Sequence, residues 1–486
     1  MSQESLHPRE VANYSGNRQA HTRRNRIILS AALASVLLLV YLFLNTSFSF
    51  RFTERPGVPN YEMLAESFLS GQLHLKQPVD PSRLKAHDPL DPSLPYPYLM
   101  DGLIFNGKYY FQHEPLPAIF RVLSVKLTGT SYSTGSVVVL SVWLSFLSMG
   151  SIMWKIRQVV WPSSRVWVFY YVWAGFGISG PQLYLAGAPV VYNESMAMGC
   201  AFLLAGSYFL LRGLVDRRHT TMNFALSGIL FGSSIGCRAE LAIYPITFCF
   251  LYFAWSLTRG GEFWLRSKQL CVLAVPVSIF GTGLLTYNYL RFGSFFDFGR
   301  SHLMFPRYIT YVHTILHGDY FSLRRIPFQL YHYLLALPAV TEKFPYLRYP
   351  FGDLIYGDVY IYLQLACSIF ITTPLLLLCL VLPWYFKYLP KGRSLRLPAI
   401  ACLLSSVTTL VMVSTTVGSL ARYMSAFTPL LYVSVFGALV GIDHKLRPAL
   451  DHSKGTIGIL ALLFAGQLFM GLLLGLTGVV QFPPPK

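Results

Sequence analysis

Apolar runs of about 20 residues recur along the chain, separated mostly by short polar connections. A helix of that length crosses the hydrocarbon core of a bilayer, so the pattern predicts an all-α polytopic membrane protein. About eleven spans are expected. They lie at residues 27–46, 134–153, 166–183, 193–211, 222–237, 241–257, 270–290, 363–385, 398–418, 424–442 and 456–478.

Two long polar segments interrupt this pattern, at residues 47–133 and 291–362. We therefore expect a basic tail, residues 1–26, followed by one transmembrane domain, residues 27–486, in which both segments form loops. Residues with useful chemistry are expected in these loops, because short connections leave little room for a site.

Lys and Arg residues gather on one side of the expected spans, and the positive-inside rule assigns that side to the cytoplasm. The opposite short loop, residues 182–192, has no Lys or Arg. We therefore expect the N-terminal tail in the cytoplasm and both long loops outside. An odd number of spans also puts the C-terminus outside. The basic residues on the cytoplasmic side are Arg18, Arg23, Arg24, Arg26, Lys155, Arg157, Arg165, Arg212, Arg217, Arg218, Arg259, Arg266, Lys268, Lys387, Lys391, Arg393, Arg396, Lys445, Arg447 and Lys454.

Composition agrees with a membrane protein, since 53% of the residues are hydrophobic, 12% are charged and the mean hydropathy is +0.47. The net charge of +18 could indicate nucleic-acid binding. However, about half of the basic residues lie in the short cytoplasmic loops, where topology and anionic membrane lipids account for them. No nucleic-acid partner is expected. The seven cysteines fall inside or at the edges of the spans, so they imply no disulfide framework or zinc site.

The first long loop begins with a segment, residues 60–73, whose apolar residues recur at helical spacing and predict an interfacial helix. Six prolines in residues 78–97 then exclude a regular helix. This irregular stretch carries the acidic pair of DPLDP, Asp88 and Asp91. Turn formation is one interpretation of the pair, and a divalent cation held between the two carboxylates is the other.

The Asn-Gly dipeptide at residues 106–107 separates two short aromatic stretches and predicts a β-hairpin. Asp101 precedes this hairpin and Glu114 follows it. The hairpin would therefore place a carboxylate on either side of a turn at the membrane surface.

These residues resemble a known family. GKYYFQHEPLPAIF is similar to the first-loop signature of the GT-C glycosyltransferases, which include lipid A aminoarabinose transferases and protein O-mannosyltransferases, and NYEMLAESFLSGQLHL resembles their juxtamembrane helix. A nearer resemblance is to a poorly characterised bacterial branch, through DPLDP, DGLIFNGKYY, VVYNES, CRAEL and NYLRFGSFFDFG. These stretches cover about a fifth of the chain, in the same order.

The resemblance implies a GT-C-like helical bundle in the cytoplasmic (inner) membrane of a bacterium. It also implies inverting transfer of a sugar from a polyprenyl-phosphate donor to a lipid, glycan or protein acceptor on the outer face. A carboxylate must then take the proton of the acceptor hydroxyl, and the departing phosphate needs cationic or hydrogen-bonding groups.

The candidate bases are Asp101, Glu114, Asp88 and Glu54, and Asp101 is favoured because it matches the acidic position of the nearer relatives. The chain departs from the better-known pattern in two places. Residues 57–60 lack the acidic residue that precedes the interfacial helix in those enzymes. In addition, Gln112 and His113 stand where the aminoarabinose transferases carry Glu and Lys. His113 can still donate a hydrogen bond to phosphate.

Three arginines, Arg238, Arg291 and Arg422, lie near the ends of separate spans and together could bind the donor phosphate. The alternative is that each extends to lipid headgroups on its own. Glu194, at the outer end of a span, is assigned either to substrate binding or to helix packing with a partner such as Arg238. The hairpin residues Lys108, Tyr109 and Tyr110 are also assigned to substrate binding.

Two other functions remain open: a lipid or glycan transporter, and a non-catalytic scaffold with the same bundle. A transporter is expected to place ionisable groups near the bilayer midplane, whereas here they gather at the ends of spans. The enzyme is therefore favoured. No metal or other cofactor is expected beyond the alternative for Asp88 and Asp91.

Overall fold

The protein is described by a computed structural model that covers residues 8–52, 61–91, 94–99, 102–216, 218–258, 262–304, 321–342, 344, 347–348, 351–356, 359–381, 396–452 and 454–481. Within these residues, eight stretches of helix are long and apolar enough to cross a membrane. The expectation of a multi-pass helical membrane protein is therefore confirmed. The helices concerned are α1 (Pro8–Asn45), α5 (Thr134–Val160), α8 (Val191–Val215), α10 (Ile243–Leu257), α11 (Phe263–Phe292), α16 (Arg396–Val413), α17 (Met424–His452) and α18 (Lys454–Gln481).

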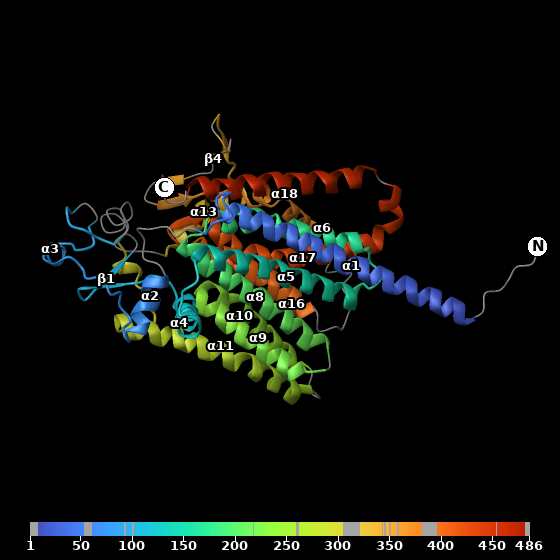
Figure 1. The fold of residues 1–486 in the computed structure, drawn as a ribbon, viewed down its shortest axis with the longest axis horizontal. Helices are drawn as coiled ribbons and strands as arrows, with labels where there is room; N and C mark the ends of the chain where they lie inside the picture. The colour runs from blue at the N-terminus through green and yellow to red at the C-terminus, as the bar shows by residue number, and fades with distance from the viewer. Residues whose placement is uncertain are drawn as a thin grey trace, which may run out of the picture.

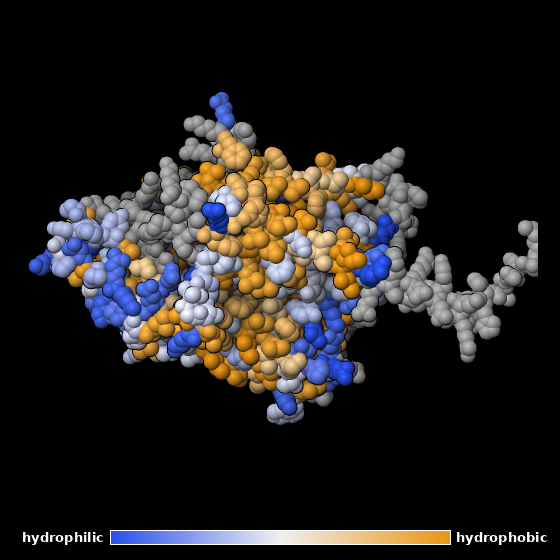
Figure 2. Space-filling model, viewed as in Figure 1, coloured by the Kyte–Doolittle hydropathy of each residue, from blue (hydrophilic) through white to orange (hydrophobic). Residues whose placement is uncertain are grey.

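The long helices run side by side along one axis, with α1 and α18 at one side of the bundle and α11 at the other (Figure 1). Helix α17 forms the centre of the bundle, since 94% of the residues in its most apolar stretch are buried. In α11 the corresponding share is 17%. Figure 2 shows apolar side chains over the middle of the bundle and hydrophilic ones mainly towards its two ends. This distribution fits a bundle whose waist is surrounded by lipid.

Three further helices complete the bundle. They are α9 (Thr220–Cys237), which packs between α8 and α11, and the pair α6 (Val166–Gly177) and α7 (Gly180–Gly187). The predicted span at residues 166–183 therefore consists of two helices. The break falls at Ser179, which begins α7, with Pro181 in the first turn of that helix.

The predicted span at residues 363–385 is wrong over residues 363–381, the part that the structure describes. The chain there forms the end of strand β6 (Val359–Gln364), then the short helices α14 (Ile369–Thr372) and η5 (Pro374–Val381). Leu365 has φ of +59°, which no regular helix or strand accommodates. Strand β6 pairs with β5 (Phe351–Tyr356) on one side and with β7 (Gly418–Leu420) on the other. A short apolar run does not by itself distinguish a buried strand from a helix.

The end of the bundle at which α1 ends and α5 begins is called the loop end here. It carries α2 (Tyr61–Leu69), α3 (Pro81–Leu84), β1 (Leu103–Phe105), β2 (Lys108–Tyr110) and α4 (Leu116–Thr128) (Figure 1). The connections between the later helices contain further short elements. They are η1 (Ala239–Ala242), η3 (Arg300–His302), η4 (Leu323–Arg325), α13 (Ile326–Leu334), β3 (Ala339–Val340), β4 (Leu347–Arg348) and η6 (Ala421–Tyr423).

The predicted hairpin is confirmed. Strands β1 and β2 pair antiparallel with Phe105 opposite Lys108. Asn106 and Gly107 have φ of +48° and +71°, the left-handed pair that a type I′ turn requires. The predicted interfacial helix is also present as α2, which buries Tyr61 and Leu64. The hairpin is joined to a much later segment, since Leu103 bridges to Leu303.

The proline-rich stretch is organised around one buried arginine. The guanidinium of Arg83 donates hydrogen bonds to backbone carbonyls of Pro89, Asp91 and Tyr96 at 3.1, 2.8 and 2.7 Å. The Asp88 carboxylate accepts from the backbone N–H of Leu90 at 2.9 Å, so Asp88 forms a turn. Within the described residues, no group of three or more His, Cys, Asp or Glu residues could hold a metal ion.

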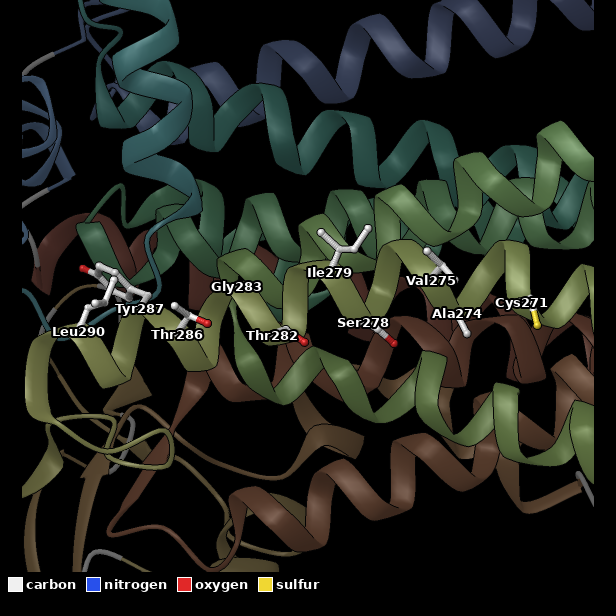
Figure 3. Close-up of a pocket in the computed structure, with 10 residues that line it drawn as sticks. All are labelled: Cys271, Ala274, Val275, Ser278, Ile279, Thr282, Gly283, Thr286, Tyr287 and Leu290. Carbon is white, nitrogen blue, oxygen red and sulfur yellow. The ribbon is translucent and has the colours of Figure 1, made fainter.

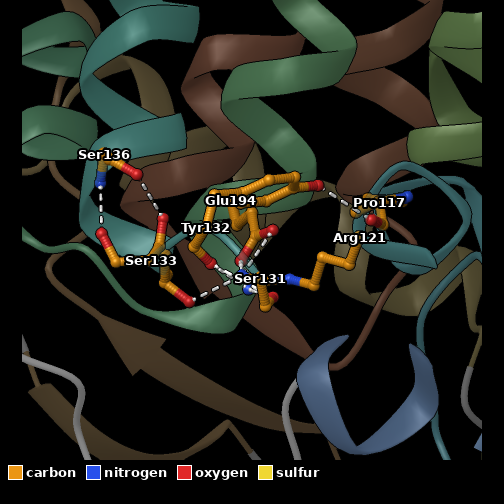
Figure 4. A network of polar contacts seen from close by, with 8 residues as sticks. Pro117, Arg121, Ser131, Tyr132, Ser133, Ser136 and Glu194 are labelled. Atoms are coloured by element: carbon orange, nitrogen blue, oxygen red, sulfur yellow. Dashed lines mark hydrogen bonds and ion pairs between the residues drawn. The ribbon is translucent and has the colours of Figure 1, made fainter. Parts of the chain in front are cut away.

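Helix α4 is fastened to α8 by a buried ion pair between Arg121 and Glu194 (Figure 4). Both carboxylate oxygens of Glu194 accept from Nη2 of Arg121, at 3.0 and 2.7 Å, and the two side chains are 2% and 0% exposed. The guanidinium also donates to the hydroxyl of Thr134 and lies over the ring of Tyr132. The suggested partner of Glu194, Arg238, is therefore wrong. The pair fixes α4, and with it the residues that precede α4, on the bundle.

Helix α18 packs closely on α6 and α7 through small residues spaced four apart, Gly471 and Gly475. A Cβ on Gly471 would lie 2.1 Å from the carbonyl oxygen of Ile178, and a Cβ on Gly187 would lie 2.3 Å from that of Gly475. Only glycine allows backbones to approach this closely.

We predict that Gly471→Ala lowers the free energy of unfolding by about 1 to 3 kcal/mol, because the added methyl group meets backbone rather than a flexible side chain. Gly458→Ala, on the same helix with nothing within 4 Å of the added Cβ, is the matched control and should be neutral or slightly stabilising. Thermal unfolding in detergent, followed by tryptophan fluorescence, measures both. Equal melting temperatures would contradict the close packing.

We predict that Arg121→Met destabilises the protein by about 3 to 5 kcal/mol, because it leaves the Glu194 carboxylate buried without its partner. Lys155→Met is the control: it removes the pair with Asp216, whose side chains are 21% and 28% exposed, and should cost about 1 kcal/mol or less. The double variant Arg121→Met with Glu194→Leu should recover much of the loss in a chemical denaturation series. No recovery would mean that the pair does not couple α4 to α8.

Candidate functional site

A group of buried and partly buried aromatic and charged side chains lies at the loop end, where four segments meet. We call it the His113 cluster. Three of these segments lie at the ends of longer elements. They are the first turn of α8, the connection from α9 into η1, and η6, which follows β7. The members are His113, Glu114, Tyr192, Arg238, Glu240, Arg422 and Tyr423.

The ring of His113 is held by two other rings. It meets Tyr192 and Phe111 edge to face, with centroids 5.2 and 5.4 Å away. Only 3% of His113 is exposed. Burial lowers the pKa of His113 well below its usual value, and the neighbouring cations Arg238, Arg300 and Arg422 lower it further. His113 is therefore a neutral imidazole at physiological pH.

Arg238 sits where α9 ends, and two carboxylates and an imidazole surround it. Its Nε lies 3.3 Å from Glu240, and its Nη1 lies 3.4 Å from Nδ1 of His113. Glu114 accepts from the backbone N–H of Ala239 at 3.1 Å. Burial raises the pKa of Glu114, whereas the Arg238 cation acts in the opposite direction. The carboxylates orient Arg238 and partly offset its charge.

Arg422 reaches the same cluster from the sheet side. Its Nη1 donates to Oε1 of Gln364, the last residue of β6, at 2.7 Å. Its guanidinium lies 4.7 Å from the ring of Tyr192, and that of Arg238 lies 5.9 Å from the ring of Tyr423. Two of the three predicted arginines are therefore brought together around His113.

Arg291 has a different position. Its Nη1 donates to the carbonyl of Phe111 and its Nη2 to the side chain of Asn288, both at 2.7 Å, and its guanidinium lies 3.9 Å from the ring of Tyr287. Arg291 thus fixes the backbone just ahead of His113. Its predicted contact with phosphate stays a prediction, while its observed role is to position this segment.

The remaining candidates divide into two groups. Asp101 and Glu54 lie outside the described residues. Tyr109 is 1% exposed and its hydroxyl accepts from the N–H of Leu99, whereas Tyr110 packs on Phe292 and Lys108 is exposed beside the turn. Glu194 is engaged by Arg121. Tyr109, Tyr110 and Glu194 therefore have observed contacts that stabilise the loop end. The assignment of these three residues and of Lys108 to substrate binding stays a prediction.

The sequence assigns no role to three residues of the cluster, Tyr192, Tyr423 and Glu240, or to Gln364, which binds Arg422. Tyr192 stands near Glu194 in VVYNES, so the sequence identifies this segment, while the assignment of Glu194 itself stays a prediction. Nothing in the sequence singles out Gln364, because its importance depends on the pairing of β6 with β7.

Four nitrogen atoms in the cluster are buried without a hydrogen-bond partner. Within the described part of the chain they are Nε2 of His113, Nε and Nη2 of Arg238, and Nε of Arg422; of these, Nε of Arg238 faces Glu240 at 3.3 Å. Buried polar atoms are normally paired, and guanidinium nitrogens can only donate. The cluster therefore offers unused donors and positive charge, which suit an anionic ligand such as a phosphate.

An apolar groove runs along the outer face of α11, with a volume of about 730 Å³ (Figure 3). One end reaches Tyr287, which contacts Arg291. The groove therefore approaches the segment that Arg291 holds. It is lined by Cys271, Ala274, Val275, Ser278, Ile279, Thr282, Gly283, Thr286, Tyr287 and Leu290.

No model of a known protein family matches the chain, and no curated protein matches it in sequence. Solved structures match it in fold. The oligosaccharyltransferase of Archaeoglobus fulgidus in the apo form aligns with a TM-score of 0.50 and 14% identity, over 94% of this chain and 56% of that chain. The present chain thus spans little more than half the length of that enzyme.

Two further structures align less well. The oligosaccharyltransferase AglB from Archaeoglobus fulgidus, in complex with an inhibitory peptide and a dolichol-phosphate, has a TM-score of 0.49 at 14% identity, over 92% of this chain and 55% of that chain. ArnT from Cupriavidus metallidurans, bound to undecaprenyl phosphate, has a TM-score of 0.43 at 13% identity, over 94% of this chain and 76% of that chain.

The alignment with the oligosaccharyltransferase extends well beyond the first loop, since it covers 94% of this chain. At 14% identity, the alignment with the oligosaccharyltransferase establishes the fold and not the reaction. The chain shares the fold of the Archaeoglobus fulgidus oligosaccharyltransferase over 94% of its own length.

Proposed function

We propose that the protein is an integral membrane glycosyltransferase that moves a sugar from a polyprenyl-phosphate donor to a hydroxyl group of a lipid, glycan or protein acceptor. The observation that carries this proposal is the His113 cluster, in which Arg238 and Arg422 bring unused donors to one buried place at the end of a GT-C bundle. A transferase of this class needs such donors for the phosphate it releases.

The chemistry is a displacement at the anomeric carbon. The acceptor oxygen forms a bond to that carbon while the bond from carbon to the phosphate oxygen breaks, which inverts the configuration. The acceptor proton passes to a carboxylate, and polyprenyl phosphate leaves with one additional negative charge. Arg238 and Arg422 oppose that developing charge in a site shielded from water, where such interactions are strong.

Asp101 is the proposed base. It directly precedes Gly102, whose carbonyl accepts from the N–H of Met304 at 3.0 Å, so the neighbouring backbone is fixed between the two long loops. Of the other three predicted carboxylates, Glu54 lies outside the described residues and two have observed structural partners: Asp88 forms its turn, and Glu114 accepts from Ala239 beside Arg238. Glu114 is therefore proposed to orient Arg238 for the phosphate.

The groove on α11 supports a lipid-linked donor. Its apolar lining faces the outside of the bundle, since Val275, Ile279 and Leu290 are 56%, 65% and 63% exposed. A polyprenyl chain needs such a surface to remain in the membrane while its phosphate enters the protein. We propose that the tail lies along α11 and that the reaction takes place on the outer face of a bacterial inner membrane, with the N-terminus in the cytoplasm and the C-terminus outside.

We predict that Asp101→Asn abolishes transfer from a polyprenyl-phosphate sugar in reconstituted vesicles, because an amide cannot accept the acceptor proton. Radiolabelled sugar transfer measures the effect, and Asp88→Asn is the control, expected to keep most of the activity. Thermal unfolding confirms that both variants fold. Full activity of a folded Asp101→Asn protein would dismiss this base.

We predict that Arg422→Gln raises the donor KM by about tenfold or more, since it removes a charged hydrogen-bond donor from the phosphate site. Lys126→Gln removes an exposed positive charge on α4 and should leave the donor KM unchanged. An equal effect of both substitutions would indicate general attraction to the membrane surface and would argue against a phosphate site in the cluster.

A further inference from the structure

We propose that His113 binds the ligand phosphate as a neutral hydrogen-bond donor through Nε2, and that Arg238 fixes the tautomer that makes this possible. The inference rests on the proposed function for the identity of the ligand. It goes further by assigning the contact to one atom and one protonation state.

The tautomer follows from the partner of Nδ1. Nη1 of Arg238 lies 3.4 Å from Nδ1 of His113. A guanidinium has five N–H donors and no acceptor, so Nδ1 must present its lone pair. In a neutral imidazole one nitrogen accepts and the other carries the proton. The proton of His113 is therefore on Nε2.

Nε2 is buried, and among the described residues it has no hydrogen-bond partner. A buried N–H without a partner is costly, so it is usually found where a ligand or water completes it. The His113 ring as a whole lies near Tyr61 and Tyr192, and the cations Arg238, Arg300 and Arg422 act on it. These surroundings favour an acceptor that carries negative charge.

The neutral state follows from the charges that face His113. Arg238, Arg300 and Arg422 are all close enough to disfavour a further positive charge, and the ring is removed from water. The adjacent carboxylate, Glu114, directs one oxygen to the backbone of Ala239. The imidazole therefore supplies direction to the ligand contact, while the arginines supply the charge.

The orientation of the ring is also fixed. Phe111 and Tyr192 meet it edge to face, and Arg291 holds the carbonyl of Phe111 at 2.7 Å. A donor held in this way loses little conformational entropy when an acceptor arrives. Its hydrogen bond strengthens as the leaving phosphate gains charge, so Nε2 contributes more to the transition state than to the bound donor.

Two substitutions distinguish the nitrogen atoms. The side-chain amide nitrogen of His113→Gln reaches the position of Nε2, whereas that of His113→Asn reaches only the position of Nδ1. We expect His113→Gln to keep kcat within about threefold of the wild type, and His113→Asn to lower kcat by about tenfold or more, because only Gln retains the donor. Equal loss in both variants, or better activity of His113→Asn, would overturn the proposal.

The tautomer is measured directly by 15N NMR of the full chain, labelled at histidine and reconstituted in vesicles. His113 is identified among the 12 histidines as the signal missing from His113→Gln. We expect a neutral imidazole protonated at Nε2, and a shift of that signal on addition of a short-chain polyprenyl phosphate. An imidazolium, protonation at Nδ1, or no response to the polyprenyl phosphate would each overturn the proposal.

The two measurements separate this inference from the proposed function. If the polyprenyl phosphate shifts the Nε2 signal but no sugar is transferred, the binding role of His113 stands and the transferase proposal fails. The NMR measurement needs only the wild-type protein and folded His113→Gln, so it decides the question even where His113→Asn unfolds the protein.

Discussion

The buried ion pair between Arg121 and Glu194 is the interaction on which the arrangement of the loop end depends. It lies at the junction of helix α4 with the bundle, where both charges are almost fully removed from water. Such a pair contributes little net stability, because desolvation offsets much of the attraction, but a mispositioned α4 would leave two buried charges unpaired. The pair therefore selects one docking position for α4, and Glu114, two residues before the start of this helix, is placed accordingly.

The site itself is assembled from segments that are far apart in the sequence, and each is held by a side chain that binds backbone or an amide. Arg291 binds the carbonyl of Phe111 and so orients the residue before Gln112 and His113. Gln364 at the end of β6 binds Arg422, so this contact joins the three-stranded sheet to the His113 cluster. Both contacts are buried or partly buried hydrogen bonds to a charged group, which are stronger than those between neutral groups. The geometry around His113 is thus imposed by its surroundings.

The sequence predicts much of this architecture. Hydropathy identifies most of the spans, and Asn106 with Gly107 identifies the hairpin, because both signals are local. Long-range pairing accounts for the span that is predicted wrongly. The run at residues 363–385 is apolar enough for a helix, but its first residues belong to strand β6, which pairs with β5 and with the distant β7. Similarly, Arg238 and Arg422 can be selected as charged residues at span ends, whereas the partner of Glu194 depends on how α4 docks. The proposal that Asp101 is the base rests on the sequence alone.

The two long loops are joined through the edge of the hairpin, where Leu103 bridges to Leu303 and Gly102 accepts a hydrogen bond from Met304. During biosynthesis the first of these residues leaves the ribosome about 200 residues before its partner, a separation that makes this contact slow to form. The first loop therefore lacks its contact with Leu303 until helices α5 to α11 have been inserted into the membrane. Maturation of the site is in this way coupled to membrane insertion, and a chain arrested before residue 304 would lack it.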